Sequence, residues 1–333
     1  MPCIREKREQ QEGLIIGPYG TLSALSRGRS VPEAEDEIRT CFQRDVDRIT
    51  HSKAFRRLRH KTQVFLQPEG DHYRTRLTHT LEVARVARTI ARALSLNEDL
   101  VEAISLGHDL GHTPFGHAGE RALRRVTGSF NHYEQSLRVV DRLEKDGRGL
   151  NLCHETRMGI LNHTTGLPRD TVEADVVRLA DHIAYLNHDL DDAERAGIVA
   201  AGDVPLIIRE RVGTRNSQRL NAMVTDAVEH SAEGRIGFSP DMKEAYDVFY
   251  DFMFEAVYRN PTAKSEESKV EGLLAPLHTY YAAHVDRLPP EYRLIAEEEG
   301  PAAAATDYVS GMTDSFAIAA FEELFIPKSW SVK

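Results

Sequence analysis

The sequence predicts an all-α protein, and three observations support that prediction. Hydrophobic residues recur every three or four positions along most of the 333-residue chain, which is the spacing that buries one face of a helix. The intervals between these patterns hold glycine or proline, which end helices. Strict alternation of hydrophobic and polar residues is scarce, and Thr62–Gln67 is the single short strand candidate.

A polar segment precedes the helical patterns. Residues 1–35 hold several helix-breaking residues, and we expect them to form an irregular N-terminal arm: Gly17, Pro18, Gly20, Gly28 and Pro32. The helical patterns then follow one another, approximately over residues 43–60, 77–96, 98–112, 117–127, 131–146, 154–163, 171–195, 204–211, 216–231, 240–259, 264–284 and 305–325.

The composition, with 41% hydrophobic and 28% charged residues, is typical of a soluble globular protein. The N-terminal sequence lacks the hydrophobic region of a signal peptide, and no hydrophobic run approaches the roughly 20 residues of a membrane span. The cysteines Cys3, Cys41 and Cys153 are widely spaced and odd in number, which argues against a disulfide framework or a thiolate zinc site. We therefore expect a cytoplasmic protein with no membrane partner.

The net charge is −10, which does not suggest a general nucleic-acid binder. Basic residues nevertheless concentrate in RDVDRITHSKAFRRLRHK, over residues 44–61. This segment is either a solvated helix face or a cationic wall for a polyanionic substrate.

Two predicted helices direct a histidine toward the core. In the pattern over 77–96, stepping back four residues from Val83 leads to His79, at the N-terminal end of the hydrophobic stripe. In the next pattern, Ile104 and His108 share a stripe. Most isolated inward histidines are satisfied core residues, but His108 is followed directly by Asp109.

The pattern over 171–195 carries polar residues on the face opposite its hydrophobic stripe: Asp181, Tyr185, His188, Asp189 and Asp192. An ordinary amphipathic surface helix is one interpretation, and a functional face is the other. With His79, His108 and Asp109, Asp181 completes a set of two imidazoles and two carboxylates. Such mixed ligands suit Mn²⁺, Fe²⁺, Co²⁺, Zn²⁺ or Mg²⁺, so the sequence predicts a divalent metal site.

Four long blocks resemble one enzyme family: FQRDVDRITHSKAFRRLRHKTQVF, EGDHYRTRLTHTLEVARVARTIARAL, HDLGHTPFGHAGE and LADHIAYLNHDLDDAERAG. They are similar to the bacterial deoxyguanosinetriphosphate triphosphohydrolases, in the HD-domain metal-dependent phosphohydrolase superfamily. TDYVSGMTDSFA, near the C-terminus, is a weaker match. The resemblance implies an HD-domain helical fold with accessory C-terminal helices. We expect an HD catalytic core over 36–200, and a helical part over 201–333 packed on it in one continuous domain.

The stretch HDLGHTPFGHAGE carries further ionisable groups. We expect His112 to lie one helical turn beyond His108, before Pro114 and Gly116 end that helix. His117 and Glu120 are then three residues apart at a new helix start, where the carboxylate can hold the imidazole. The alternative for Glu120 is simple compensation of the helix dipole.

The resemblance implies hydrolysis of a dNTP to a deoxynucleoside and inorganic triphosphate. It assigns the metal to His79, His108, Asp109 and Asp181, and phosphate binding to Arg76. Proton transfer to the leaving oxygen falls to His117 oriented by Glu120, with His112 beside the α-phosphate. His132, in NHYEQS, matches a further active-site histidine, although a plain helix-start residue is an equal alternative. A second Mg²⁺ would accompany the triphosphate. Lys53 and Arg259 are weaker candidates for phosphate contacts.

Selection of deoxyribose is expected on the polar face of the 171–195 helix. By resemblance, Tyr185 packs under the sugar, where a 2′-hydroxyl would clash. Asp189 and Gln63 match partners of the 3′-hydroxyl, and Tyr258 is placed near the base. One departure is His182, where the animal relative with SAM and HD domains has a lysine directed at phosphate.

Two other functions are left open. The protein could hydrolyse another nucleotide, such as a dNMP or (p)ppGpp, or it could be a non-catalytic HD protein that binds nucleotides or single-stranded DNA. P-loop and dinucleotide-binding motifs do not occur. The resemblance implies a homo-oligomer, for which a hexamer is one candidate. Which dNTP is preferred, and whether a second dNTP or single-stranded DNA activates the enzyme, cannot be derived from the residues.

Overall fold

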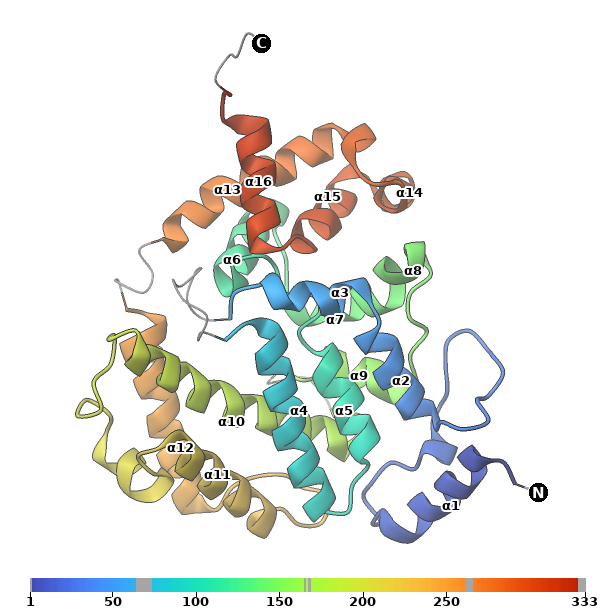
Figure 1. The fold of residues 1–333 in the computed structure, drawn as a ribbon, viewed down its shortest axis with the longest axis vertical. Helices are drawn as coiled ribbons and strands as arrows, with labels where there is room; N and C mark the ends of the chain where they lie inside the picture. The colour runs from blue at the N-terminus through green and yellow to red at the C-terminus, as the bar shows by residue number, and fades with distance from the viewer. Residues whose placement is uncertain (1, 64–73, 165, 167–168, 261–265, 329–333) are drawn as a thin grey trace.

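The computed structural model describes residues 2–63, 74–164, 166, 169–260 and 266–328. The described chain is built from α-helices joined by turns and by some longer irregular segments, such as the one between α1 and α2 (Figure 1). The helices of the N-terminal half are α1 (Ile4–Ile15), α2 (Cys41–Thr50), α3 (Lys53–Arg57), α4 (Arg76–Ala93), α5 (Glu98–Gly107), α6 (Gly116–Thr127), α7 (His132–Arg138), α8 (Glu144–Gly147) and α9 (His154–Leu161). Those that follow are α10 (Val172–Arg195), α11 (Asn216–His230), α12 (Pro240–Met253), α13 (Glu267–Ala283), α14 (Pro290–Glu299), α15 (Pro301–Ser310) and α16 (Asp314–Phe325).

Within the described ranges there is no β-strand, only isolated bridges such as the one between Thr62 and Thr75. The prediction of an all-α protein is therefore confirmed. Most of the strand candidate, residues 64–67, lies outside the described residues. None of the described helices is long and hydrophobic enough to cross a membrane.

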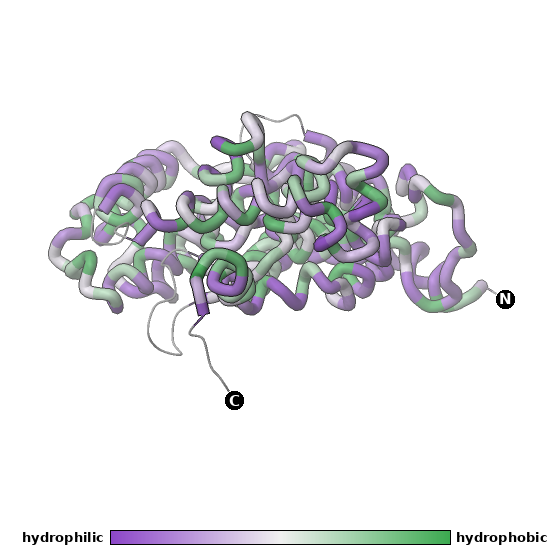
Figure 2. Tube along the Cα trace, turned by 90° about the horizontal axis from the view of Figure 1, so that it is seen from above, coloured by the Kyte–Doolittle hydropathy of each residue, from purple (hydrophilic) through white to green (hydrophobic). Residues whose placement is uncertain are grey.

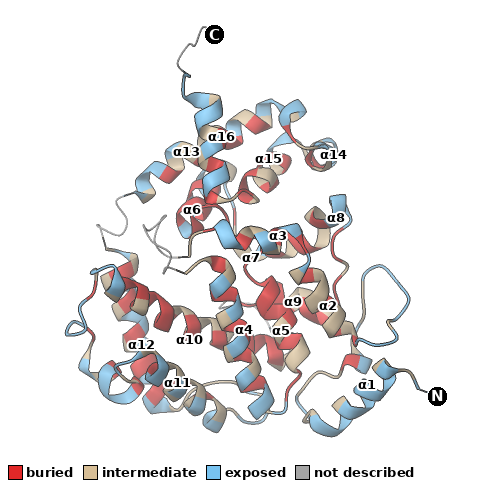
Figure 3. Cartoon of the chain, viewed as in Figure 1, coloured by how far each residue is buried: buried red, intermediate tan, exposed pale blue. Residues whose placement is uncertain are grey.

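The centre of the molecule is the packing of α4 against both α5 and α10 (Figure 1). Each of these three helices begins at a side chain that accepts a hydrogen bond from a backbone amide of the first turn. Thr75 accepts from the Thr78 amide, Asn97 from the Leu100 amide, and Thr171 from the Ala174 amide. Buried residues concentrate along α5 and α10 (Figure 3). Seen from above, hydrophobic and hydrophilic residues alternate along the helices, as amphipathic packing requires (Figure 2).

The C-terminal helices form a second hydrophobic cluster with α6. This cluster joins Phe115 and Leu123 of the α6 region to Leu274 of α13 and Val309 of α15. In Figure 1 these helices occupy the upper part of the molecule, above α4, α5 and α10. The helix that begins at Gly116 is thus supported by residues more than 140 positions further along the chain.

Several helix boundaries differ from the expectation. The prediction of an irregular arm over 1–35 is wrong for Ile4–Ile15, which forms α1. None of the α1 residues is buried, so hydrophobic periodicity could not reveal this helix. An ion pair of 2.7 Å between Arg5 and Glu9, one turn apart, stabilises it instead. The pattern over 305–325 is divided at Gly311 into α15 and α16. Helix α5 ends at Gly107, so His112 does not lie on the same helix as His108.

Candidate active site

Helices α4, α5 and α10 bring three of the expected metal ligands together. His79 lies in the first turn of α4, His108 directly follows α5, and Asp181 lies within α10. His79 Nε2 is 3.0 Å from Asp181 Oδ1, and His108 Nε2 is 3.9 Å from the same oxygen. One potential ligand atom from each residue lies within 4.8 Å of the other two. We call these three residues the metal group.

The hydrogen bonding of His108 tests whether the metal group suits a cation. His108 Nδ1 lies 2.6 Å from the Ser105 carbonyl oxygen, which only accepts hydrogen bonds, so Nδ1 carries the proton. In the neutral ring, the form that ligates metals, the buried Nε2 presents a lone pair, and it makes no hydrogen bond to the described residues. It faces Asp109 Oδ1 at 3.5 Å and Asp181 Oδ1 at 3.9 Å. A divalent cation between this lone pair and the two carboxylates would be ligated by all three, so the donor set fits a divalent metal.

Asp109, the fourth expected ligand, lies at the edge of the metal group. Its Oδ2 accepts a hydrogen bond of 2.8 Å from Arg76 Nη1, and its Oδ1 is 3.3 Å from His112 Nε2. Burial alone would raise the pKa of Asp109, but the positive charge of Arg76 is among the neighbouring charges that hold it well below its usual range. Burial likewise opposes ionisation of Asp181, yet its hydrogen bond to His79 lowers the pKa of that carboxyl. Both carboxyls are therefore ready to ligate as anions.

The expected catalytic residues form a second group next to the metal group. Glu120 Oε2 lies 3.3 Å from His117 Nδ1 and 3.1 Å from His132 Nδ1, and Arg124 donates to the other carboxylate oxygen. The His112 ring stacks on His132, with ring centroids 4.1 Å apart. The hydrogen bonds from His117 and His132 overcome burial and lower the pKa of Glu120. We call His112, His117, Glu120 and His132 the imidazole group.

His163 connects the two groups, and sequence reasoning missed it. Its Nδ1 lies 2.7 Å from the Ile160 carbonyl, while its Nε2 lies 3.3 Å from His132 Nε2. Its ring also lies edge-on to His108, with centroids 5.1 Å apart. Burial lowers the pKa of His163 to about 3. The only signal in the sequence was a histidine in the polar segment after α9, which has no distinctive spacing.

Both groups border one cavity of about 710 Å³, which also contains the expected sugar-binding residues. Among the expected metal, catalytic and sugar-site residues, only the buried His108 and Glu120 do not line it. Those that do are Gln63, Arg76, His79, Asp109, His112, His117, His132, Asp181, Tyr185, Asp189 and Tyr258. Additional lining residues that the sequence did not single out are Phe115, Arg121, His163, Thr164, Tyr250, Phe254 and Glu267.

Where Tyr185 and Asp189 of α10 line the cavity, Tyr258 donates a short hydrogen bond to Asp189 Oδ2. Burial raises the pKa of Asp189 to about 7 in spite of this bond. His182 also lines the cavity; Tyr246 lies 2.6 Å from its Nδ1 and holds the ring beside Tyr185. His182, where the animal relative has a lysine, is therefore an imidazole held in a fixed orientation.

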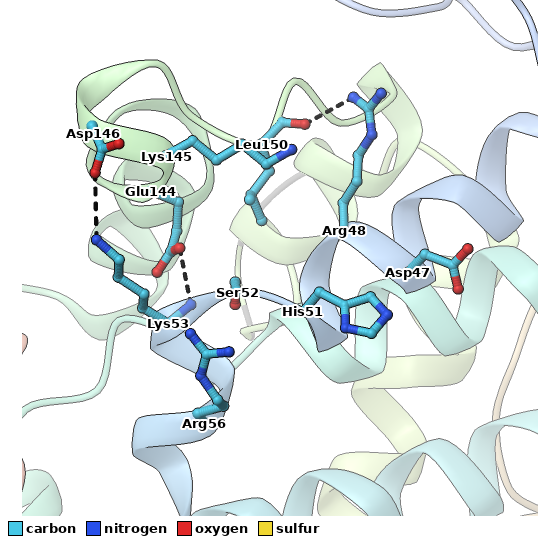
Figure 4. A pocket seen from close by; sticks show the side chains of 10 residues that line it. All are labelled: Asp47, Arg48, His51, Ser52, Lys53, Arg56, Glu144, Lys145, Asp146 and Leu150. Atoms are coloured by element: carbon cyan, nitrogen blue, oxygen red, sulfur yellow. Dashed lines mark hydrogen bonds and ion pairs between the residues drawn. The ribbon is translucent and has the colours of Figure 1, made fainter.

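The two weaker phosphate candidates lie in different places. Lys53 lines a separate cleft of about 390 Å³, where it pairs with Asp146 at 3.4 Å (Figure 4). A phosphate role for Lys53 in the main cavity is therefore wrong. Arg259 is at the rim of the main cavity, 4.7 Å above the Phe254 ring and paired with Glu255.

An all-α fold with a histidine–aspartate group at the junction of three central helices defines an HD-domain phosphohydrolase. Comparison with family models agrees, because residues 76–186 match the HD domain and residues 236–323 match the phosphohydrolase-associated domain.

Close relatives cover nearly the whole chain. A deoxyguanosinetriphosphate triphosphohydrolase-like protein of Caldanaerobacter subterraneus subsp. tengcongensis is 50% identical over 329 residues, spanning 98% of this chain and 97% of the relative. A protein of the same name from Desulfatibacillum aliphaticivorans is 48% identical, spanning 97% and 98%. The chain belongs to the family of deoxyguanosinetriphosphate triphosphohydrolase-like proteins.

A phosphohydrolase structure from Bacteroides thetaiotaomicron has a similar fold, with a TM-score of 0.52 and 18% sequence identity. The similarity covers 82% of this chain and 66% of that one. At this identity the likeness concerns the fold alone.

Proposed function

We propose that this protein is a metal-dependent dNTP triphosphohydrolase, which converts a dNTP and water into a deoxynucleoside and inorganic triphosphate. The observation that carries the proposal is a single cavity lined by His79 and Asp181 of the metal group, by Arg76, and by Tyr185 and Asp189. A cavity of about 710 Å³ lies within the size range of small-molecule sites. The names of the close relatives support the same activity.

His79, His108, Asp109 and Asp181 would hold the divalent cation, whether Mn²⁺, Mg²⁺, Fe²⁺, Co²⁺ or Zn²⁺. When bound there, the cation supplies Lewis acidity toward an α-phosphate oxygen and lowers the pKa of a coordinated water. Arg76, fixed by its hydrogen bond to Asp109, would present the rest of its guanidinium to the phosphates. A further Mg²⁺ would accompany the triphosphate.

Breaking the bond to O5′ requires a proton at the leaving oxygen. The His117 ring is 64% exposed, toward the cavity, and Glu120 holds it from behind. His117 would therefore donate the proton to O5′, with Glu120 stabilising its charged form. His112 lies beside Asp109 and would contact the α-phosphate, and His132 would keep Glu120 in place from the other side.

The sugar would bind beside Tyr185 and Asp189 of α10. The Tyr185 ring would pack against C2′ and exclude a ribose hydroxyl. Asp189 would hydrogen-bond the 3′-hydroxyl, together with Gln63, whose buried Oε1 makes no hydrogen bond to the described residues. Tyr258 orients Asp189 by direct donation and would lie near the base. The preferred dNTP, activation by a second dNTP or single-stranded DNA, a homo-oligomeric state and a cytoplasmic location stay predictions.

Product analysis tests the proposal. Each of the four dNTPs and four NTPs is incubated with the protein and Mg²⁺ or Mn²⁺, alone and in mixtures, with a dNMP and (p)ppGpp as additional arms. We expect deoxynucleoside and triphosphate in equal amounts, and ¹⁸O from labelled water in the triphosphate, because water attacks the α-phosphorus. Release of orthophosphate or pyrophosphate would identify a different phosphohydrolase, and no turnover in any arm would favour a binding protein.

A further inference from the structure

The turn that separates His112 from His117 has a backbone conformation that needs external support. Phe115 has φ 62° and ψ 24°, in the left-handed region that non-glycine residues rarely adopt, and Gly116 follows with φ 56°. Two successive left-handed residues reverse the chain between the metal group and the start of α6. The placement of His117 and Glu120 relative to Asp109 therefore depends on what holds this turn.

The turn is held by Asp314, the first residue of α16. Asp314 Oδ1 accepts a hydrogen bond of 2.9 Å from the Phe115 amide. Its Oδ2 accepts from the amide of Thr62 at 2.9 Å and from the Thr62 hydroxyl. The Asp314 side chain is buried, with 4% exposed surface. One carboxylate thus joins the turn at Phe115 to the segment at Thr62, and these two residues lie 199 and 252 positions before Asp314 in the sequence.

A second contact from the same C-terminal region supports the turn. Lys61 is buried and donates through Nζ to the carbonyl oxygens of both His112 and Ser310. Lys61 and Thr62 are consecutive, so the segment held by Asp314 is also anchored to the residue where the turn begins. The position of His112 is therefore tied to the junction of α15 and α16.

The turn also packs directly against the expected phosphate-binding arginine. A Cβ atom added at Gly116 would lie 3.0 Å from the Arg76 guanidinium and 3.5 Å from the Thr62 carbonyl. No side chain fits between them without displacement. Loosening of the turn would consequently move Gly116 relative to Arg76 as well as His117 relative to the metal group.

We infer that Asp314 is a positioning residue of the active site, through which the C-terminal, phosphohydrolase-associated part of the chain fixes the catalytic turn. Asp314 does not line the cavity and touches no reacting atom. It acts through the Phe115 amide and Thr62, and its effect on catalysis rests on the proposed function of His117 and Glu120. A misplacement of about 1 Å at such a site can lower the rate about 100-fold.

The experiment compares Asp314→Ala with Thr313→Ala. Thr313 caps the same helix by accepting a hydrogen bond from the Phe316 amide, but within the described residues its side chain makes no hydrogen bond to the turn. Its loss therefore reproduces the local weakening of α16 alone. We expect both variants to melt at a lower temperature than the wild type and to keep the metal. For Asp314→Ala we expect kcat to fall about 100-fold with KM changed less than about 3-fold, while Thr313→Ala keeps its kcat. Equal kcat values in the two variants would overturn the inference.

Hydrogen exchange provides a readout independent of turnover. The amides of Thr113 and of residues 115–118 should exchange faster in Asp314→Ala than in the wild type or in Thr313→Ala, and unchanged exchange would overturn the inference. If the wild type hydrolyses no nucleotide, the proposed function fails while this measurement still decides the role of Asp314. Should Asp314→Ala not fold, Asp314→Asn serves instead. The asparagine keeps an acceptor for the Phe115 amide but weakens the contact with Thr62. The amides of the turn should therefore exchange faster in this variant than in the wild type, but less fast than complete loss of the side chain would allow.

Discussion

The metal group and the imidazole group are adjacent, yet they are built differently. His79 and His108 are 2% and 1% exposed; His79 lies on α4 and His108 directly follows α5, and both of these central helices pack on α10. His117 is mostly exposed and lies at the start of α6, after a left-handed turn that Asp314 holds. The core alone preforms the first group, whereas the second depends on contacts with the C-terminal helices. Changes to the two groups should therefore have separable effects on metal content and on turnover.

The largest effect is expected from the metal group. Asp181→Asn removes the anionic ligand that faces both imidazoles, so the protein should lose its bound cation, and kcat/KM should fall about 1,000-fold or more. Metal analysis by mass spectrometry and a turnover assay check this result. Asp191→Asn, a change of the same type on the same helix but outside the cavity, should keep both metal and activity. Full metal content in Asp181→Asn would show that Asp181 is not a ligand.

The next effect separates the two groups. His117→Gln and Glu120→Gln remove the proposed proton donor or its partner, so kcat should fall about 100- to 10,000-fold, the range for general acid–base catalysis. The cation should stay bound, because neither side chain belongs to the metal group. Loss of metal from these variants would mean that the two groups act as one site.

A smaller effect is expected at the sugar. Tyr185→Ala opens space beside C2′, so the ratio of kcat/KM for a dNTP to that for the matching NTP should fall about 10- to 100-fold. Tyr185→Phe keeps the ring and should keep the discrimination. Competing hydrolysis of dGTP and GTP measures the ratio, and the same ratio in Tyr185→Ala and the wild type would refute the steric gate.

The smallest effect concerns the pH dependence of stability in chelator-treated protein. Burial raises the pKa of Asp189 to about 7, so the folded state holds a proton there that the unfolded state has released above pH about 4. Asp189 therefore favours folding below about pH 4, and this contribution is lost as the pH rises toward 7. Its full size is about 4 kcal/mol at most.

Urea unfolding between pH 4 and 8 measures this contribution. The free energy of unfolding of Asp189→Asn should fall less over this range than that of the wild type, whereas Asp191→Asn should follow the wild type. Parallel curves for Asp189→Asn and the wild type would show that Asp189 is ionised throughout.

The sequence could predict the features that follow from local periodicity. Helical spacing predicted that His79 and His108 point toward the core. In the 171–195 pattern it predicted a polar face with Asp181, Tyr185 and Asp189, and the structure brings these three residues to one cavity. Helix α1 escaped this reasoning because it buries no residue. His163 and Asp314 escaped it because their importance comes from contacts with residues far along the chain, which no spacing in the sequence records.

The central claim is that one divalent cation binds the metal group. Anomalous diffraction from crystals grown with Mn²⁺ tests it most directly. We predict one strong peak within about 2.0–2.4 Å of ligand atoms of His79, His108 and Asp181, with Asp109 completing the set. A peak on His112, His117, Glu120 and His132 instead, or no peak between α4, α5 and α10, would contradict the account.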